Sequence, residues 1–227
     1  TNVRSFIFDE KGEVLGQAFR EMEIYRPKRD WAEEEPEELW RATLETMKGS
    51  VKASKISPDD VAMISFSAQM HGMSMIDRKG KVLARLLTWL DLRAAPECEK
   101  LGETIDSYEL YSRTGCPPIF IYPFVKILWV KENMPKIFEQ CHKVLSAKDY
   151  IMYRMLGEPY LDQSVAAGSQ LLNIHKLKWD DRILEIAGID EDKLPLLCDG
   201  YEVIGELPRT IAKLSYTHLR AHETVLD

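Results

Sequence analysis

The sequence predicts a domain of mixed α/β class, and three observations support this prediction. Residues 5–19 and 73–89 each contain two apolar runs on either side of a short glycine-containing turn, the pattern of an antiparallel hairpin. Beyond residue 91 the chain reads mostly as helix. No Walker loop and no G-x-G-x-x-G fingerprint is present. The element order therefore differs from a uniform βαβ series, and a mixed sheet with flanking helices is expected.

The first hairpin comprises residues 5–9 and 13–19, and we expect it to continue to about residue 24. A helix follows from Pro36, because proline suits the first turn of a helix and the neighbouring glutamates favour its positive end. The apolar residues of this helix fall on one face: Trp40, Leu44, Met47 and Val51.

A turn at residues 57–60 separates that helix from residues 61–66 (VAMISF), whose apolar run predicts a buried strand. The second hairpin comprises residues 73–77 and 82–89. We expect this strand and both hairpins to contribute to one mixed sheet.

The second half of the chain is predicted to be mainly helical, with Gly157 and Gly188 ending two of its helices. Helices are expected at residues 93–105, 107–113, 124–133, 137–142, 148–156 and 181–187, and extended segments at 144–146 and 169–174.

The composition is ordinary for a globular protein, with 45% apolar and 30% charged residues in 227. A net charge of −7 and scattered basic residues give no general attraction to nucleic acid or to an anionic membrane. The longest uncharged window is short for a membrane span, and no signal peptide is visible. A cytoplasmic protein is expected.

The four cysteines are too far apart for a zinc site. We interpret Cys98, Cys116, Cys141 and Cys198 as reduced thiols that serve as small core residues. A catalytic cysteine is the weaker alternative, because no base is evident nearby.

Several short motifs occur in a fixed order along the chain. They are residues 1–4 and 8–12, Trp31-Ala32-Glu33 with Pro36-Glu37, residues 67–72 (SAQMHG), 88–93 (TWLDLR), 113–117, 148–150, 171–174 and 179–180. Each motif is weak alone, but the ordered set resembles the FGGY family of carbohydrate kinases from residue 1 to about residue 213.

The resemblance implies an actin-like, ribonuclease-H-like ATPase fold of two lobes, with the sugar and ATP meeting in the cleft between them. Residues 1–213 resemble the N-terminal, sugar-binding lobe without its first strand and phosphate loop. ATP and Mg²⁺ are the cofactors implied. Thr1, Asn2 and Arg4 follow the position of the phosphate loop and are the expected cofactor contacts.

The resemblance also implies a sugar contact at Met70 and His71. Chemically this is reasonable, because imidazole both donates and accepts hydrogen bonds and Gly72 lets the backbone approach a ligand. The alternative is a buried histidine with satisfied hydrogen bonds at the end of a strand. By residue chemistry alone, Met70, Met73 and Met75 are all expected in the core, which is the alternative for Met70.

Three further residues are candidates for the sugar pocket: Trp89, Asp91 and Tyr122. The alternatives are an ordinary surface ion pair between Asp91 and Arg93, and a packing role for the Tyr122 ring. The acidic residues 33–35 are interpreted as a solvated helix start rather than a metal site.

A sugar kinase of this kind transfers the γ-phosphoryl group of MgATP to a hydroxyl group, with a carboxylate accepting the hydroxyl proton. In the family that aspartate is expected beyond about residue 215, and no catalytic residue is assigned here. Residues 214–227 do not resemble the family and are expected to be a foreign tail. This chain alone is expected to be inactive.

The expected substrate is a pentulose or aldonate such as xylulose or gluconate, and the sequence leaves the two open. The expected partners are this small sugar or sugar acid and, as an option, a second copy in a homodimer. The rival interpretation is a non-catalytic binding or scaffold module with the actin-like fold.

Overall fold

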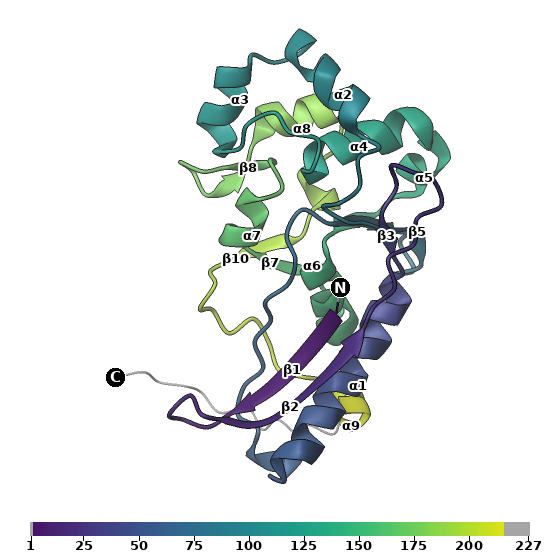
Figure 1. Cartoon of the computed structure of the whole chain (residues 1–227). Helices are drawn as coiled ribbons and strands as arrows, with labels where there is room; N and C mark the ends of the chain where they lie inside the picture. The colour runs from purple at the N-terminus through teal and green to yellow at the C-terminus, as the bar shows by residue number, and fades with distance from the viewer. Residues whose placement is uncertain (1, 216–227) are drawn as a thin grey trace.

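A two-stranded hairpin packed on one long helix forms the lower end of the elongated molecule in Figure 1. The computed structural model describes residues 2–215. β1 (Asn2–Phe8) pairs antiparallel with β2 (Val14–Glu21), and α1 (Pro36–Ser54) lies against both strands. Gly16 brings β2 closer to the backbone of α1 than any side chain would allow. The first hairpin and the helix that begins at Pro36 are confirmed.

A four-stranded sheet occupies the middle of the molecule, with the strand order β3-β5-β4-β6. Its strands are β3 (Glu33–Glu34), β5 (Val82–Leu87), β4 (Met73–Ile76) and β6 (Lys143–Leu145). All three neighbouring pairs are antiparallel, and every residue of β4 is buried. This confirms the second hairpin and the short strand near residue 144.

Helices dominate the upper part of the molecule, above the sheet in Figure 1. The remaining elements are α2 (Ala95–Lys100), α3 (Ser107–Thr114), α4 (Pro123–Asn133), α5 (Pro135–Gln140), α6 (Ala147–Leu156), β7 (Tyr160–Asp162), α7 (Gln163–Ala167), β8 (Leu172–Asn173), β9 (Lys178–Trp179), α8 (Asp181–Ala187), β10 (Leu196–Cys198) and α9 (Arg209–Ser215). Short 3₁₀ turns lie at Pro58–Asp60, Leu101–Glu103 and Glu191–Lys193. β7 and β10 form a parallel pair, whereas β8 and β9 are antiparallel. The class is mixed α/β, as predicted.

Residues 61–66 do not form a strand, so that prediction is wrong. An apolar run becomes a strand only where another backbone supplies a hydrogen-bonded ladder, and no strand among the described residues pairs with this one. Figure 1 shows the segment as part of a long strand-free stretch. The two hairpins also lie in separate sheets rather than in one.

Some predicted elements have different bounds. The helix expected at residues 93–105 is the shorter α2 followed by a 3₁₀ turn, because Pro96 sits in its first turn and Gly102 weakens its continuation. α5 begins at Pro135 instead of residue 137 for the same reason of proline placement. Only two residues of the extended segment expected at 169–174 belong to β8.

Two hydrophobic cores stabilise these elements. The larger core surrounds α4, whose Phe124, Val125 and Ile127 are fully buried. The smaller core joins α1 to α6 through Trp40 and Tyr150. Met73 and Met75 are buried in the larger core, as predicted.

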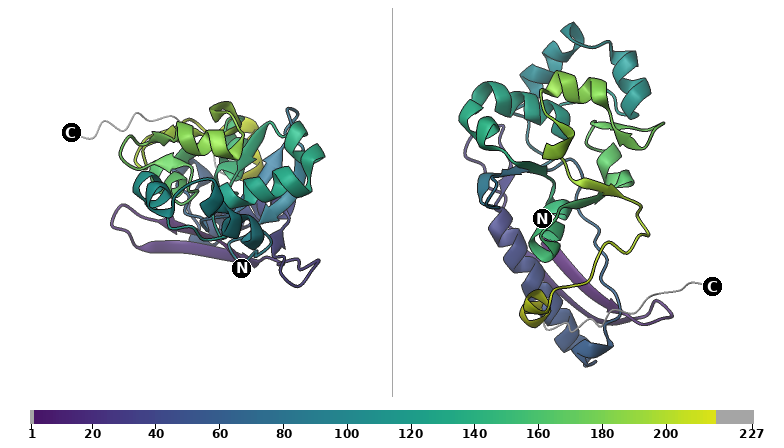
Figure 2. Two further views of the ribbon diagram at one scale, coloured as in Figure 1. Left: turned by 90° about the horizontal axis from the view of Figure 1, so that it is seen from above. Right: turned by 180° about the vertical axis from the view of Figure 1, so that it is seen from behind.

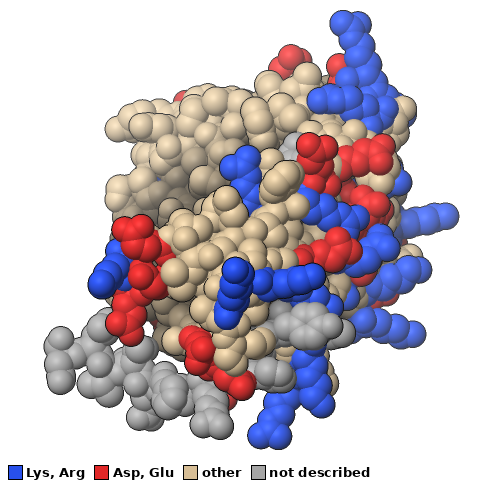
Figure 3. Space-filling model, turned by 60° about the horizontal axis from the view of Figure 1, so that its bottom comes forward, with Lys and Arg blue, Asp and Glu red and all other residues tan. Residues whose placement is uncertain are grey.

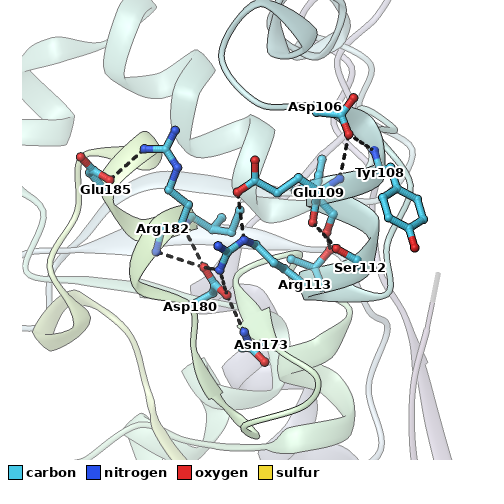
Figure 4. A network of polar contacts seen from close by, with 12 residues as sticks. Asp106, Tyr108, Glu109, Ser112, Arg113, Asn173, Asp180, Arg182 and Glu185 are labelled. Carbon is cyan, nitrogen blue, oxygen red and sulfur yellow. Dashed lines mark hydrogen bonds and ion pairs between the residues drawn. The ribbon is translucent and has the colours of Figure 1, made fainter.

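A polar network shown in Figure 4 ties α3 to the start of α8. Asp180 caps α8 by accepting hydrogen bonds from the backbone of Arg182 and Ile183. The same carboxylate accepts bonds from the Arg113 guanidinium at 3.2 Å and from the Asn173 amide at 2.7 Å. These partners hold the pKa of Asp180 below its usual range, although burial opposes them.

Charges of both signs are interspersed on the face shown in Figure 3, and its upper left part carries few of them. This face offers no continuous basic surface of the kind that nucleic acid needs. Among the described residues, no helix combines the length and apolar character that a membrane crossing requires. All four cysteines are free thiols, as expected, and Cys116 and Cys141 are buried.

Candidate functional site

His71 occupies a strained backbone position two residues before the start of β4. Its φ of 64° lies in the left-handed region, which is uncommon for residues other than glycine and often marks a functional site. Its Nδ1 lies 2.7 Å from the carbonyl oxygen of Gly168. Because a carbonyl can only accept, Nδ1 carries the proton, and in the neutral ring Nε2 remains an acceptor. This ring orientation leaves Nε2 for a second partner.

Gly168 is the residue against which Met70 and His71 pack. A Cβ atom built on Gly168 would overlap the Met70 terminal methyl group and would lie 3.2 Å from the His71 Cε1. The structure thus brings Met70 and His71 to the end of α7, about 100 residues away in the chain. A side chain at position 168 would displace the end of Met70 and press on the His71 ring.

Tyr122 joins the same group. Its ring meets the His71 ring edge-on, with the ring centroids 5.0 Å apart, and it is the residue directly before α4. Burial, together with the neighbouring Cys116 thiol, raises the pKa of Tyr122 to about 12. The hydroxyl group therefore stays protonated at neutral pH and remains able to donate a hydrogen bond.

A small cavity of about 30 Å³ lies beside His71. Such a volume has room for one or two water molecules. Its lining residues include Met73, Ser146, Asp149 and Gly168. Asp149 is buried, accepts a hydrogen bond from Ser146, and has one carboxylate oxygen without a partner among the described residues. Burial raises the pKa of Asp149 to about 7.

Trp89 and Asp91 lie in a turn after β5, and their side chains differ in exposure. The Trp89 side chain is exposed, with 49% of its surface accessible, whereas Asp91 is completely buried. Asp91 accepts two 2.7 Å bonds from the Arg93 guanidinium and a 2.7 Å bond from the backbone of Ala32. The ion pair predicted between Asp91 and Arg93 exists, but it is buried instead of at the surface.

The acidic residues of β3 are not solvated, which corrects the prediction for residues 33–35. Glu33 and Glu34 are buried at 7% and 1% exposure. Glu33 accepts a 2.6 Å bond from Arg93, and Glu34 accepts a 2.6 Å bond from Gln69. The two carboxylates are buried because each has a charged or amide partner that arrives from a distant part of the chain.

β3 and the residue before it contact both segments that carry the predicted sugar contacts. Its neighbour Ala32 binds the turn of Trp89 twice, through the Thr88 amide and the Thr88 hydroxyl, both at 3.0 Å. Glu34 binds Gln69, the residue next to Met70. The Trp31 ring stacks on the Arg93 guanidinium at 3.6 Å. This strand fixes the distance between the segments around His71 and Trp89.

Lys126 was missed by the sequence analysis, although it also joins these two segments. Its ammonium group donates to the carbonyl oxygens of His71 at 2.7 Å and of Thr88 at 2.8 Å. The side chain is fully buried. The available signal was a lysine among the apolar residues of α4, where a charge needs an internal partner.

Two of the three expected cofactor contacts lie on β1. Asn2 and Arg4 are exposed on β1 and bind each other through a 2.9 Å hydrogen bond, and Thr1 lies outside the described residues. Among residues 2–215 no cluster of three metal-ligating side chains occurs.

Comparisons with known proteins agree with this architecture. Residues 1–217 match the FGGY family of carbohydrate kinases, N-terminal domain. The chain is 34% identical to the xylulose kinase of Escherichia coli (strain K12) over 94% of its own length, and 31% identical to the gluconokinase of Bacillus subtilis (strain 168) over 93%. These alignments cover 43% and 41% of the two relatives.

Solved structures give the same result. A gluconate kinase and a ligand-bound xylulose kinase, both from Lactobacillus acidophilus, superpose with a TM-score of 0.91 at 27% identity. Each comparison covers 96% of this chain and 44% of the other. The fold is that of the actin-like sugar kinases. The chain belongs to the FGGY family of carbohydrate kinases and corresponds to its N-terminal domain, less than half the length of these relatives.

Proposed function

We propose that this chain is the sugar-binding lobe of an ATP-dependent carbohydrate kinase. The observation that carries the proposal is the packing of Met70 and His71 on Gly168 and of the Tyr122 ring on His71, within a chain that belongs to this family. The proposed substrate is a pentulose or an aldonate such as xylulose or gluconate. Phosphoryl transfer would go from ATP, with Mg²⁺, to one hydroxyl group of the sugar.

The residues of this chain bind and orient the sugar in this proposal. The Nε2 of His71 accepts a hydrogen bond from a sugar hydroxyl, because Nδ1 is already bound to Gly168. The exposed Trp89 indole offers an apolar face to the carbon side of the ring or chain. Asp91 accepts bonds from Arg93 and Ala32, so its proposed contribution is to position the turn that carries Trp89.

The proposal also includes binding of the cofactor. We assign Thr1, Asn2 and Arg4 to the ATP side by their place in the family pattern. ATP, the cytoplasm as compartment and a homodimer are likewise proposals. The four free thiols support a reducing compartment.

The proposal is tested by measuring sugar binding and turnover with a panel of xylulose, ribulose, gluconate and glycerol. Titration calorimetry on this chain measures sugar affinity, and a coupled ADP-release assay with MgATP on the longer protein that contains it measures turnover. We expect saturable binding of at least one of xylulose, ribulose and gluconate, and turnover of the same compound. Absence of both for the entire panel would favour the rival function, a non-catalytic scaffold with the actin-like fold.

A further inference from the structure

We propose that Lys126 is a positioning residue for sugar binding, because it holds the His71 and Thr88 backbones at a fixed separation. This inference rests on the proposed function, since it takes His71 and Trp89 as the two sides of the sugar pocket. Lys126 is not a catalytic residue, because its ammonium group binds main-chain carbonyls.

The geometry of Lys126 is that of a bridge between two segments. One hydrogen bond of 2.7 Å reaches the carbonyl oxygen of His71, and one of 2.8 Å reaches that of Thr88, the residue next to Trp89. The lysine comes from the first turns of α4, in the larger hydrophobic core. A bridge anchored in a rigid helix fixes both segments better than either segment alone would be fixed.

The electrostatic surroundings show that this bridge has a substantial cost. Among the described residues no carboxylate forms an ion pair with Lys126, although Asp91 lies near enough to favour its charge while Arg93 opposes it. Burial dominates and lowers the pKa of Lys126 to about 7. A lysine stays at such a place only if its hydrogen bonds compensate for the lost hydration. Both compensating bonds go to the proposed sugar pocket.

The backbone of His71 gives a second reason for this role. A residue with φ of 64° stays in that conformation only when its surroundings hold it there. Gly168 binds the His71 ring and Lys126 binds its carbonyl group, so the two contacts together determine where the imidazole lies. Without Lys126 the His71 backbone loses a hydrogen bond that helps to hold it in this conformation.

The test compares Lys126→Met, which keeps the length and apolar character but removes the donors, with Lys131→Met. Lys131 is a matched control, because it also lies on α4 and donates to a backbone carbonyl, that of Ala187 at 3.4 Å. Lys126→Gln, with a shorter donor group, serves as the conservative variant. Each purified chain is titrated with the sugar of the panel that the unaltered chain binds best.

We expect Lys126→Met to weaken sugar binding by about tenfold or more, which is the effect of losing one well-placed hydrogen bond to the sugar. Lys126→Gln should recover part of this loss, and Lys131→Met should stay within about twofold of the unaltered chain. In the longer kinase the KM for sugar should rise while the KM for ATP stays unchanged. If Lys126 only stabilised the fold, its replacement would not raise the KM for sugar selectively over the KM for ATP.

Amide exchange provides a readout that does not depend on the sugar. The amides of Thr88 and Asp91 are hydrogen-bonded to Ala32 and Thr88, and Lys126→Met should accelerate their exchange by at least about tenfold. If the unaltered chain binds no sugar of the panel and the longer protein turns none of them over, the proposed function fails, and this exchange rate alone decides the bridging role.

Three results would overturn the inference. The first is a folded Lys126→Met chain that binds sugar as tightly as the unaltered chain. The second is amide exchange at Thr88 and Asp91 that does not change. The third is the unfolding of both Lys126 variants while Lys131→Met folds, which would make Lys126 a requirement for folding instead of a positioning residue.

Discussion

Arg93 holds Asp91, which lies in the same turn as Trp89, with two parallel N–H···O bonds of 2.7 Å each. Such bidentate pairing fixes the carboxylate in both distance and plane. Arg93 also donates to Glu33 on β3 and stacks on Trp31. One buried guanidinium therefore connects this turn to the strand that also binds Gln69.

Replacing Arg93 by methionine should strongly destabilise the fold. It leaves Asp91 and Glu33 buried without their counter-charge, and breaking a buried pair in this way costs about 3–5 kcal/mol. Urea unfolding measures the free energy of unfolding directly. The control is Arg182→Met, which removes an exposed pair with Glu185 and should change that free energy by less than about 1 kcal/mol. Equal losses in the two variants would contradict this account of Arg93.

This buried pair also marks the limit of what the sequence could predict. The two hairpins and most helix ends were predictable, because glycine turns, Pro36 and Gly157 act through their immediate neighbours. The burial of Glu33 was not, since its partner Arg93 lies 60 residues further along the chain. From the local sequence alone, three acidic residues at the start of a helix are expected to be exposed to solvent.

The same limit explains residues 61–66 and the site itself. Their apolar composition predicts a strand, but composition carries no information on whether a neighbouring backbone is there to pair with them. Met70 and His71 were identified only through the family resemblance. Their contacts with Gly168 join segments 97 residues apart, which no local pattern contains.

The pH dependence of stability should reveal the buried carboxyl group of Asp149. Its pKa is about 7 in the folded state against an ordinary 3.8, so between these pH values the folded chain binds more protons than the unfolded chain. The contribution of Asp149 to the free energy of unfolding therefore falls as pH rises from about 4 to about 7. Asp149→Asn should remove that slope, measured by urea unfolding at a series of pH values.

Asp77→Asn is the matched control for Asp149→Asn. Two backbone amides of its turn, those of Lys79 and Lys81, hold the pKa of Asp77 below its usual range. Its contribution therefore has the opposite sign and is lost as pH falls. If both variants changed the slope in the same direction, the assignment of a buried protonated Asp149 would be wrong.

Gly168→Ala should weaken sugar binding more than it weakens the fold. The new methyl group would overlap the flexible end of Met70 and press on the His71 ring, which can move at little cost to the core. We expect sugar affinity to fall by about tenfold, measured by calorimetry. Gly102→Ala is the control, because a Cβ atom there meets nothing within 4 Å. If Gly168→Ala left the sugar affinity unchanged, Met70 and His71 would not be sugar contacts.

Asp180→Ala should cost more stability than Asp106→Ala, although each removes a helix cap. Asp106 caps α3 alone, and losing such a cap costs about 1 kcal/mol. Asp180 caps α8 and also accepts bonds from Arg113 and Asn173, so we expect a loss of about 2–4 kcal/mol. Thermal unfolding of both variants gives the comparison. Equal losses would mean that the network in Figure 4 adds nothing beyond capping.

The most direct test of the central claim is the sugar affinity of His71→Ala beside that of His175→Ala. His175 is a matched control, since one of its ring nitrogens also contacts a backbone carbonyl, that of Ser112 at 2.8 Å. The account predicts that His71→Ala weakens binding of the preferred sugar by about tenfold or more, while His175→Ala stays within about twofold. If His71→Ala bound that sugar as tightly as the unaltered chain, His71 would not be a sugar contact and the site would lie elsewhere.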